Sequence, residues 1–319
     1  MPLVSALIPT YNRAERVGGA VETVLNQTHD DVEAVVVVDG STDDTESVLA
    51  AYADDDRVRV RVNEENRGIS YSFNRAAAVA DGEFYCILGD DDRWHPEKVE
   101  RQLEKFASLP DDFGVVYTGG VLATEEGRVT RRYRPDQRGD LYPDIFRGFH
   151  LHPHSSHMIR ARDYDAVGGF DPDFPRGVDW EMTVRLAKRC KFDYLPEVLV
   201  RRTFHGSNIS DEPEQLDVGR YMWKKYREEM VEYPDVAHAF LASWYLAKSR
   251  IELRHDRNYR EGVRSAAKAL HHQPSANAAI RFVIALTGPT GLQTAALARR
   301  AGASVQSTLL GGYDEGTGW

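Results

Sequence analysis

The chain has 319 residues, of which 42% are apolar and 28% charged, a composition that excludes a disordered polymer and can bury a sizeable core. Forty lysines and arginines stand against 50 aspartates and glutamates, so the net charge of −10 disfavours a general nucleic-acid binder. The two cysteines exclude a disulfide framework and a CxxC zinc site.

Strand and helix patterns alternate over the first 120 residues. Apolar runs, one of which alternates with arginines as edge strands do, predict strands at 3–8, 32–38, 57–62, 83–88 and 115–117. Apolar residues at helical spacing, or helix-start residues, predict helices near 17–25, 42–52, 70–80 and 96–106. Short β-α units in this order predict an α/β fold with a doubly wound, mostly parallel, Rossmann-like sheet.

The alternation stops near residue 121. A hairpin over 121–133, a histidine-rich loop, a helix from about Asp179 and a strand over 192–202 predict a second half of the same domain. Beyond 210 the pattern is helical, with one stretch that resembles a single tetratricopeptide-like helix pair. We therefore expect a domain over 1–210, divided at 120, and a helical C-terminal appendage over 211–319.

Polar segments follow three of the predicted strands. In parallel sheets ligands bind at the carboxyl ends of the strands, which are the places that 9–13, 39–45 and 89–92 occupy. Asp90, Asp91 and Asp92 are suited to Mg²⁺ or Mn²⁺ that bridges to phosphates, although an acidic turn before a helix is the alternative. Asp39 could bind a nucleobase or ribose, or cap its own turn.

The first of these loops holds Tyr11 and Arg13. The Tyr11 ring could stack on a base and the Arg13 guanidinium could meet phosphate, whereas a plain turn and helix start is the alternative for each.

Six segments in this order resemble the family-2 glycosyltransferases of the GT-A fold: IPTYNR, VVVDGSTDDT, NRGISYSFNRA, ILGDDDRW, GGFDPDF with VDWEMTVRLA, and RTFHGSNIS. The resemblance covers about residues 1–210. It implies a GT-A-type sheet whose first 120 residues bind a nucleotide-sugar and whose residues 121–210 face the acceptor. A UDP-sugar is the favoured donor, and Mn²⁺ or Mg²⁺ the implied cofactor.

The resemblance also implies roles for individual residues. Pro9, Tyr11, Arg13, Asp39 and Asp90 would bind the nucleotide. The metal would be held by Asp91, with Asp92 and His205 as further ligands. Asp179 would be the general base of an inverting transfer, in which a single carboxylate suffices. The chain departs from the family pattern at Gly89, where an acid is common, and at Val178, which replaces the glutamate beside the base.

Other readings stay open or are excluded. A dehydrogenase would need a glycine-rich turn where PTYNRAERVGG stands, and the P-loop motif is absent. A catalytically silent nucleotide-sugar-binding scaffold and a sugar-phosphate nucleotidyltransferase remain alternatives. His150, His152, His154 and His157 are expected to form an acceptor-facing loop or strand edge or, alternatively, a zinc site.

The partners and the location are further expectations. The acceptor would be a glycan or a lipid-linked sugar, reached from the cytoplasm or at the inner face of the membrane. Contact with that membrane could run through 282–286, while the basic run 131–135 is a solvated face or attracts a phosphorylated acceptor. No apolar run reaches the ~20 residues that a membrane-spanning helix needs.

Overall fold

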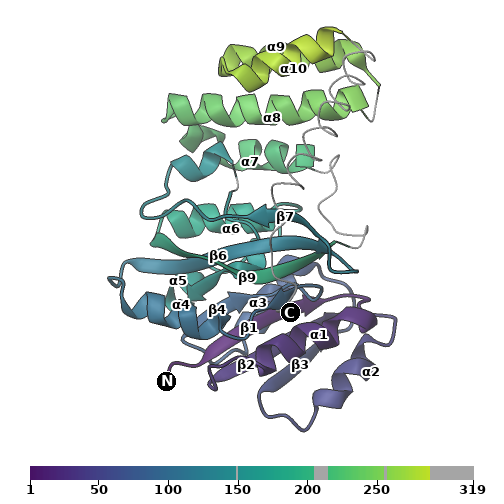
Figure 1. Cartoon of the computed structure of the whole chain (residues 1–319), viewed down its shortest axis with the longest axis vertical. Helices are drawn as coiled ribbons and strands as arrows, with labels where there is room; N and C mark the ends of the chain where they lie inside the picture. The colour runs from purple at the N-terminus through teal and green to yellow at the C-terminus, as the bar shows by residue number, and fades with distance from the viewer. Residues whose placement is uncertain (149, 205–214, 255–256, 288–319) are drawn as a thin grey trace. The chain divides into compact units, whose positions relative to one another are not determined.

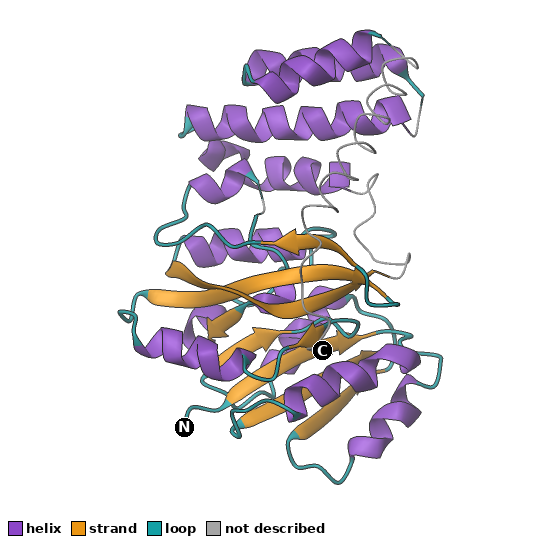
Figure 2. Cartoon of the chain, in the orientation of Figure 1, coloured by secondary structure: helices purple, strands orange, loops and turns teal. Residues whose placement is uncertain are grey.

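A computed structural model describes residues 1–148, 150–204, 215–254 and 257–287. The chain divides into two compact units (Figure 1). The described residues of the first unit are 1–145 and 150–204, and those of the second are 146–148, 215–254 and 257–287. Strands occur in the first unit, whereas the second is built from helices (Figure 2).

The described strands of the first unit form one nine-stranded sheet in the order β3-β2-β1-β4-β8-β6-β9-β5, with β7 paired to β6. The parallel part consists of β1 (Val4–Thr10), β2 (Val32–Asp39), β3 (Val58–Asn63) and β4 (Phe84–Ile87). The mixed part consists of β8 (Met158–Arg160), β6 (Phe113–Thr124), β7 (Val129–Tyr133), β9 (Lys191–Phe204) and β5 (Arg93–Trp94). In this part β6 and β9 run parallel, while β8 is antiparallel to β4 and β6.

Helices cover both faces of this sheet. On one face α1 (Ala14–Leu25) and α4 (Lys98–Ala107) share a core with alternate residues of β1, β2 and β4. On the other face α3 (Ile69–Ala77) contacts β1 and β2, and α5 (Ala161–Ala166) packs Tyr164 edge-on against Tyr85, with ring centroids 5.4 Å apart. Every residue of β2 is buried, as its nearly continuous apolar run predicts for a strand covered on both sides. The predicted doubly wound α/β sheet is confirmed.

β1 and β6 run past the ends that the sequence predicts for them. β1 continues through Pro9 to Thr10 because these two residues pair with Val37 and Val38 of β2. On the β4 side, the last bond is the one that Leu7 O accepts from Leu88 N. The backbone groups of alternate residues face the same neighbouring strand, so the nitrogen of Pro9 faces β4, as that of Leu7 does. Because the last residue pair between β1 and β4 is Leu7 with Ile87, the missing N–H of Pro9 removes no hydrogen bond from the sheet. β6 was expected over 115–117, but it runs into the hairpin strand as one element. Register shifts at Gly119 and Gly120 bend it without ending it.

The second unit stacks α7 (Gln215–Met230), α8 (Pro234–Arg254), α9 (Tyr259–His272) and α10 (Ala276–Leu286). Asn258 and Ser275 cap α9 and α10 by accepting from Glu261 N and Ala278 N. The Ser249 hydroxyl donates to Gly262 O at 2.7 Å, which ties α8 to α9. Among the described helices, none has the length and hydropathy of a membrane span.

Candidate functional site

Two carboxyl-end loops of the sheet are joined by hydrogen bonds. Asn12, whose φ of 52° lies in the left-handed region, donates its backbone N–H to Ser41 Oγ (3.0 Å) and accepts from Thr42 N (2.8 Å) through its side chain. Arg13 N donates to Thr45 Oγ1 at 3.0 Å. The loops after β1 and β2 therefore form one surface, from which the Tyr11 side chain projects 44% exposed. Asparagine adopts a positive φ more readily than most residues, so its occurrence at position 12 is a local sequence signal for this turn.

Asp39, at the end of β2, holds the segment that follows β3. Its Oδ1 accepts from Asn63 Nδ2 (2.5 Å) and Arg67 N (2.9 Å), and its Oδ2 accepts from Gly68 N (2.8 Å). A carboxylate has lone pairs for further donors. A cavity of about 350 Å³ lies beside this segment; its lining includes Asn63, Arg67, Tyr71 and Arg75. The buried Asp39 thus shapes the wall of a polar pocket.

The three consecutive aspartates form a tight turn after β4. Asp92 N donates to Gly89 O at 3.1 Å. A Cβ at position 89 would lie 3.1 Å from Asp91 Oδ1 and 3.3 Å from Asp92 Oδ2, so glycine leaves room for two carboxylates. Burial raises the pKa of Asp90 to about 6, and the charge of Asp91 adds to the shift while Arg13 opposes it. The opening loop and the acidic turn therefore share one electrostatic environment.

Asp92 points into the protein and Asp91 is less buried. Ser155 donates its hydroxyl to Asp92 Oδ2 and accepts from Gly89 N at 3.1 Å, while its carbonyl accepts from Trp94 Nε1 at 2.8 Å. Burial, followed by the charge of Asp91, raises the pKa of Asp92 to about 7. Acids with raised pKa values in one turn favour a nearby cation, because it offsets the cost of ionising them.

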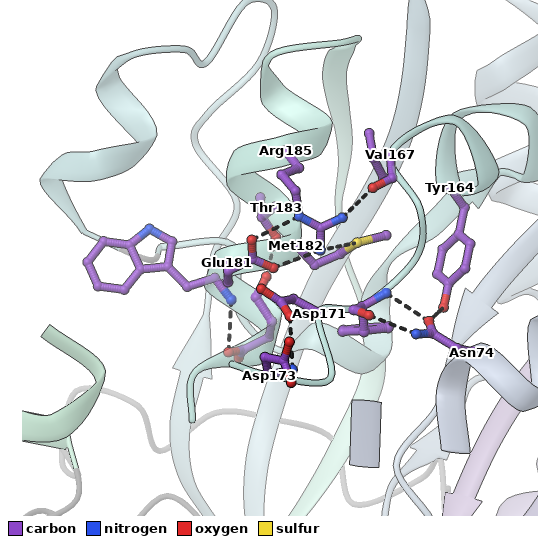
Figure 3. Close-up of polar contacts among 12 residues, drawn as sticks. Asn74, Tyr164, Val167, Asp171, Asp173, Glu181, Met182, Thr183 and Arg185 are labelled. Carbon is purple, nitrogen blue, oxygen red and sulfur yellow. Dashed lines mark hydrogen bonds and ion pairs between the residues drawn. The ribbon is translucent and has the colours of Figure 1, made fainter. Parts of the chain in front are cut away.

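Asn74 of α3 holds the loop that leads to the predicted base (Figure 3). Its Nδ2 donates to Phe170 O at 2.7 Å, and its Oδ1 accepts from Phe170 N at 2.8 Å and from Tyr164 Oη at 3.1 Å. The Phe170 ring stacks on Phe73, with centroids 4.6 Å apart. Sequence reasoning assigned no role to Asn74, since its partners lie about 90 residues away.

Asp179 is the second residue of α6 (Val178–Ala187) and is half-buried. It accepts from Trp180 N at 2.9 Å. Two residues further, the fully buried Glu181 forms a two-bond ion pair with Arg185, whose Nη1 also donates to Val167 O at 2.6 Å (Figure 3). Because a buried charge is costly unless paired, this pair anchors α6 to the loop before it. The i,i+4 spacing was a signal for it in the sequence.

His152 and Arg202 connect the acidic turn to Asp179. The charge of Arg202 opposes the raised pKa of Asp92, and the same charge acts on His152. Burial lowers the pKa of His152, while the charge of Asp179 opposes that shift. In the series Asp92, Arg202, His152 and Asp179, each side chain therefore lies near the charge of the next one. Sequence reasoning placed the histidines near the acceptor but assigned no role to Arg202.

The structure thus gathers most of the predicted residues in the first unit. Contacts join the loop of Pro9, Tyr11 and Arg13 to that of Asp39, while electrostatic interactions join Arg13 to the acidic turn and Arg202 to both this turn and the surroundings of Asp179. His205 lies outside the described residues. Within the described ranges, no three His, Cys, Asp or Glu side chains are arranged to hold a metal on their own.

Comparisons with known proteins identify the family of the chain. The sequence profile of glycosyl transferase family 2 matches residues 5–168. Chondroitin synthase of Escherichia coli is 31% identical over 211 residues, which are 66% of this chain and 30% of that protein. The chain also spans 36–41% of the length of three Rickettsia glycosyltransferases that it matches.

Two solved structures share the fold. TarS 1-349 of S. aureus in complex with UDP-GlcNAc superposes with a TM-score of 0.64 at 17% identity, over 85% of this chain and 82% of that one. The mannosyltransferase PcManGT of Pyrobaculum calidifontis, in complex with GDP-Man and Mn²⁺, superposes with a TM-score of 0.57 at 18% identity, over 97% and 85%. At these identities the likeness establishes the GT-A-type fold.

Proposed function

We infer that this chain, which belongs to glycosyl transferase family 2, moves a sugar from a nucleotide-diphosphate sugar to an acceptor hydroxyl with inversion at the anomeric carbon. The observation that carries the proposal is the electrostatic chain from the acidic turn through Arg202 and His152 to Asp179. It supports one site with a donor side and a base side, which a single displacement requires.

The donor would lie across the joined loops after β1, β2 and β4. Pro9, Tyr11 and Arg13 would line the nucleotide pocket, Asp39 would meet the base, and Asp90 the ribose. A UDP-sugar is the favoured donor, and the TarS complex with UDP-GlcNAc supports it, whereas the mannosyltransferase complex keeps GDP-sugars as a rival.

The carboxylates of the acidic turn fit a divalent cation. Their oxygen-only donor set suits Mn²⁺ or Mg²⁺, which typically takes one or two carboxylates and completes its shell with phosphate oxygens and water. Asp91 would be the main ligand, with Asp92 and His205 as further ligands. When bound, the metal compensates the charge of the departing diphosphate. The complex of PcManGT with Mn²⁺ supports this cofactor.

Asp179 would take the proton of the acceptor hydroxyl. Its place at the start of a helix fixed by the Glu181–Arg185 pair holds the carboxylate while one face stays accessible. Inversion needs a base on the face opposite the leaving group and no second nucleophile. The hydroxyl oxygen attacks the anomeric carbon, the bond to the diphosphate breaks, and the proton goes to Asp179.

The test of this function compares Asp179→Asn with wild type in UDP-sugar hydrolysis and transfer. Removing a general base is expected to lower both rates by about 10²–10⁴-fold. The affinity for UDP, measured by calorimetry with Mn²⁺, is expected to stay unchanged. Equal activity of the variant would refute the role of Asp179, and wild type that binds UDP but turns over no donor would favour a scaffold.

A metal test uses thermal unfolding with UDP, with and without Mn²⁺. Ligand at about 100 times its Kd stabilises a folded state by about 2.7 kcal/mol, and the Tm should rise by several degrees when both are present. Asp91→Asn is expected to remove the Mn²⁺-dependent part and keep the rest. If UDP raises the Tm equally with and without Mn²⁺, the proposed metal cofactor is refuted.

The acceptor and the location are the remaining parts of the proposal. The match to a chondroitin synthase supports a glycan acceptor, and a lipid-linked sugar is the alternative. Residues 1–210 would carry the transfer and 211–319 would form the appendage, which could rest on a membrane. On α10 the exposed apolar side chains are Ile280, Val283 and Leu286, while Phe282 packs inward. Binding to anionic vesicles in a sedimentation assay would test the membrane contact.

A further inference from the structure

Two arginines share one face of the strands β7, β6 and β9. Leu122 of β6 pairs with Arg131 of β7 on one side and with Arg202 of β9 on the other. Directly paired residues of neighbouring strands point to the same face of a sheet, so both arginines flank Leu122 on one surface. Arg132, which pairs with Val121, points to the opposite face.

Tyr133 and His152 extend this surface. Tyr133 lies two residues beyond Arg131 and thus on the same face, with the Arg131 guanidinium carbon 5.5 Å from its ring centroid. The Tyr133 and His152 ring centroids are 5.7 Å apart. A Cβ at Gly120 would come within 2.7 Å of Pro153, so the missing side chain lets the histidine loop lie against β6. Arg131, Tyr133 and His152 form a continuous patch, which we call the β7 wall.

The β7 wall reaches the predicted base. The charges of Asp179, Arg202 and Arg131 all act on His152. Burial lowers the pKa of His152, so its imidazole is neutral at pH 7 and the positive charge of the β7 wall belongs to Arg131. Arg202 also interacts with the carboxylates of the acidic turn.

Arg131 differs from Arg202. Its side chain is exposed, and within the described part of the chain it rests on the Tyr133 ring without forming an ion pair with a carboxylate. A guanidinium held in place by an aromatic ring can bind a planar or tetrahedral anion by donating its N–H groups. An aromatic face beside it suits the apolar face of a sugar ring.

We propose that the β7 wall binds an anionic group, a carboxylate or a phosphate, on the acceptor sugar, with Arg131 as the residue that contacts it. This inference rests on the proposed function and names its acceptor class. An anionic acceptor must approach a base and a diphosphate that are both negative, and Arg131 offsets that repulsion. A neutral acceptor gains nothing from it.

The experiment titrates three matched sugars into the full chain loaded with UDP and Mn²⁺. They are methyl β-D-glucoside, methyl β-D-glucuronide and methyl β-D-glucoside 6-phosphate, and binding is followed by ligand-observed NMR. We expect at least one anion to bind about tenfold more tightly than the neutral sugar. The anion that binds more tightly shows whether the acceptor group is a carboxylate or a phosphate.

Arg131→Gln should erase this preference and leave the neutral sugar unaffected, whereas the control Arg132→Gln, on the opposite face, should keep it. Equal binding of the three sugars, no binding of either anion, or equal losses in both variants would overturn the inference. UDP affinity and donor hydrolysis are measured in parallel, and the titrations are repeated without UDP. If wild type neither binds UDP nor hydrolyses the donor, the proposed function fails, and the inference about the acceptor is judged separately from the titrations without UDP.

Discussion

A single side chain, Asn74, links two segments that the sequence separates by 96 residues. Its amide makes both possible hydrogen bonds to the backbone of Phe170. Removing one partner of such a pair leaves polar groups without hydrogen bonds, which costs about 1–3 kcal/mol. Asn74 therefore positions the loop before α6 and, through it, Asp179.

Asn74→Ala is expected to lower the free energy of unfolding by about 1–3 kcal/mol. Because the loop leads to the base and not to the donor loops, kcat should fall while the donor KM stays near wild type. Asn74→Asp, which keeps the acceptor but loses the donor to Phe170 O, should show an intermediate kcat. Steady-state kinetics and urea unfolding measure both; a rise in donor KM at constant kcat would contradict the role.

Buried histidines make stability depend on pH at the residue scale. Burial lowers the pKa of His154 to about 3 and that of His157 well below its usual value. Below pH ~6.5 these two histidines take up protons in the unfolded chain but stay neutral in the folded one. Their contribution to the free energy of unfolding is therefore complete above pH ~6.5 and declines as the pH falls.

We expect the free energy of unfolding to fall with a slope of up to ~1.4 kcal/mol per pH unit for each such histidine between pH 6 and 4. His154→Phe keeps a ring against Phe170 and removes one titrating group. Urea unfolding across this range should show a shallower slope for the variant. A slope identical to that of wild type would refute the assignment to His154.

Among the elements, the loop before α6 depends on two glycines. Gly168 and Gly169 both have positive φ, of 80° and 67°. A Cβ at 169 would lie 2.3 Å from Asn74 Oδ1, whereas a Cβ at 168 would meet nothing within 4 Å. A substitution at either glycine would strain the backbone, but only a side chain at position 169 would also collide with Asn74.

Gly168→Ala should therefore cost about 1 kcal/mol for the backbone alone. Gly169→Ala should cost clearly more, because its methyl group also displaces Asn74. In the double variant Gly169→Ala with Asn74→Ala, the cost should be smaller than the sum of the two single costs. Thermal unfolding of the four proteins measures this; additive costs would show that the contact does not carry the effect.

Some elements were predictable and others were not. Nearly continuous apolar runs such as that of β2 predict a strand by themselves, because both faces of such a strand are covered. β5 and β8 have two and three residues, too few for any period to appear, and they exist because longer neighbours β9, β4 and β6 offer pairing partners.

At the scale of the whole molecule, two units with separate cores should unfold separately. In the second unit Leu253, Ala266 and Ala285 form a core with Tyr259, Val263 and Phe282 around it. A Cβ at Gly262 would lie 2.6 Å from the Leu253 side chain, so Gly262→Ala pushes α8 and α9 apart. Overpacking of this kind typically costs about 1–3 kcal/mol.

In calorimetry Gly262→Ala is expected to lower the Tm of one transition and leave the other, which UDP with Mn²⁺ raises, unchanged. Ser249→Ala, which removes the hydrogen bond to Gly262 O, serves as a milder variant of the same contact. One shared transition that shifts as a whole would contradict the proposed division near residue 210.

Local patterns were sufficient for the α/β alternation, for the polar loops after strands and for the run of three aspartates, since each depends on neighbours within a few residues. Folding alone decides that Asp39 closes the segment after β3, that Asn74 meets Phe170, and that Arg131 and Arg202 share a face. Those contacts join residues 24 to 96 positions apart or depend on strand register, and neither leaves a periodic trace in the chain.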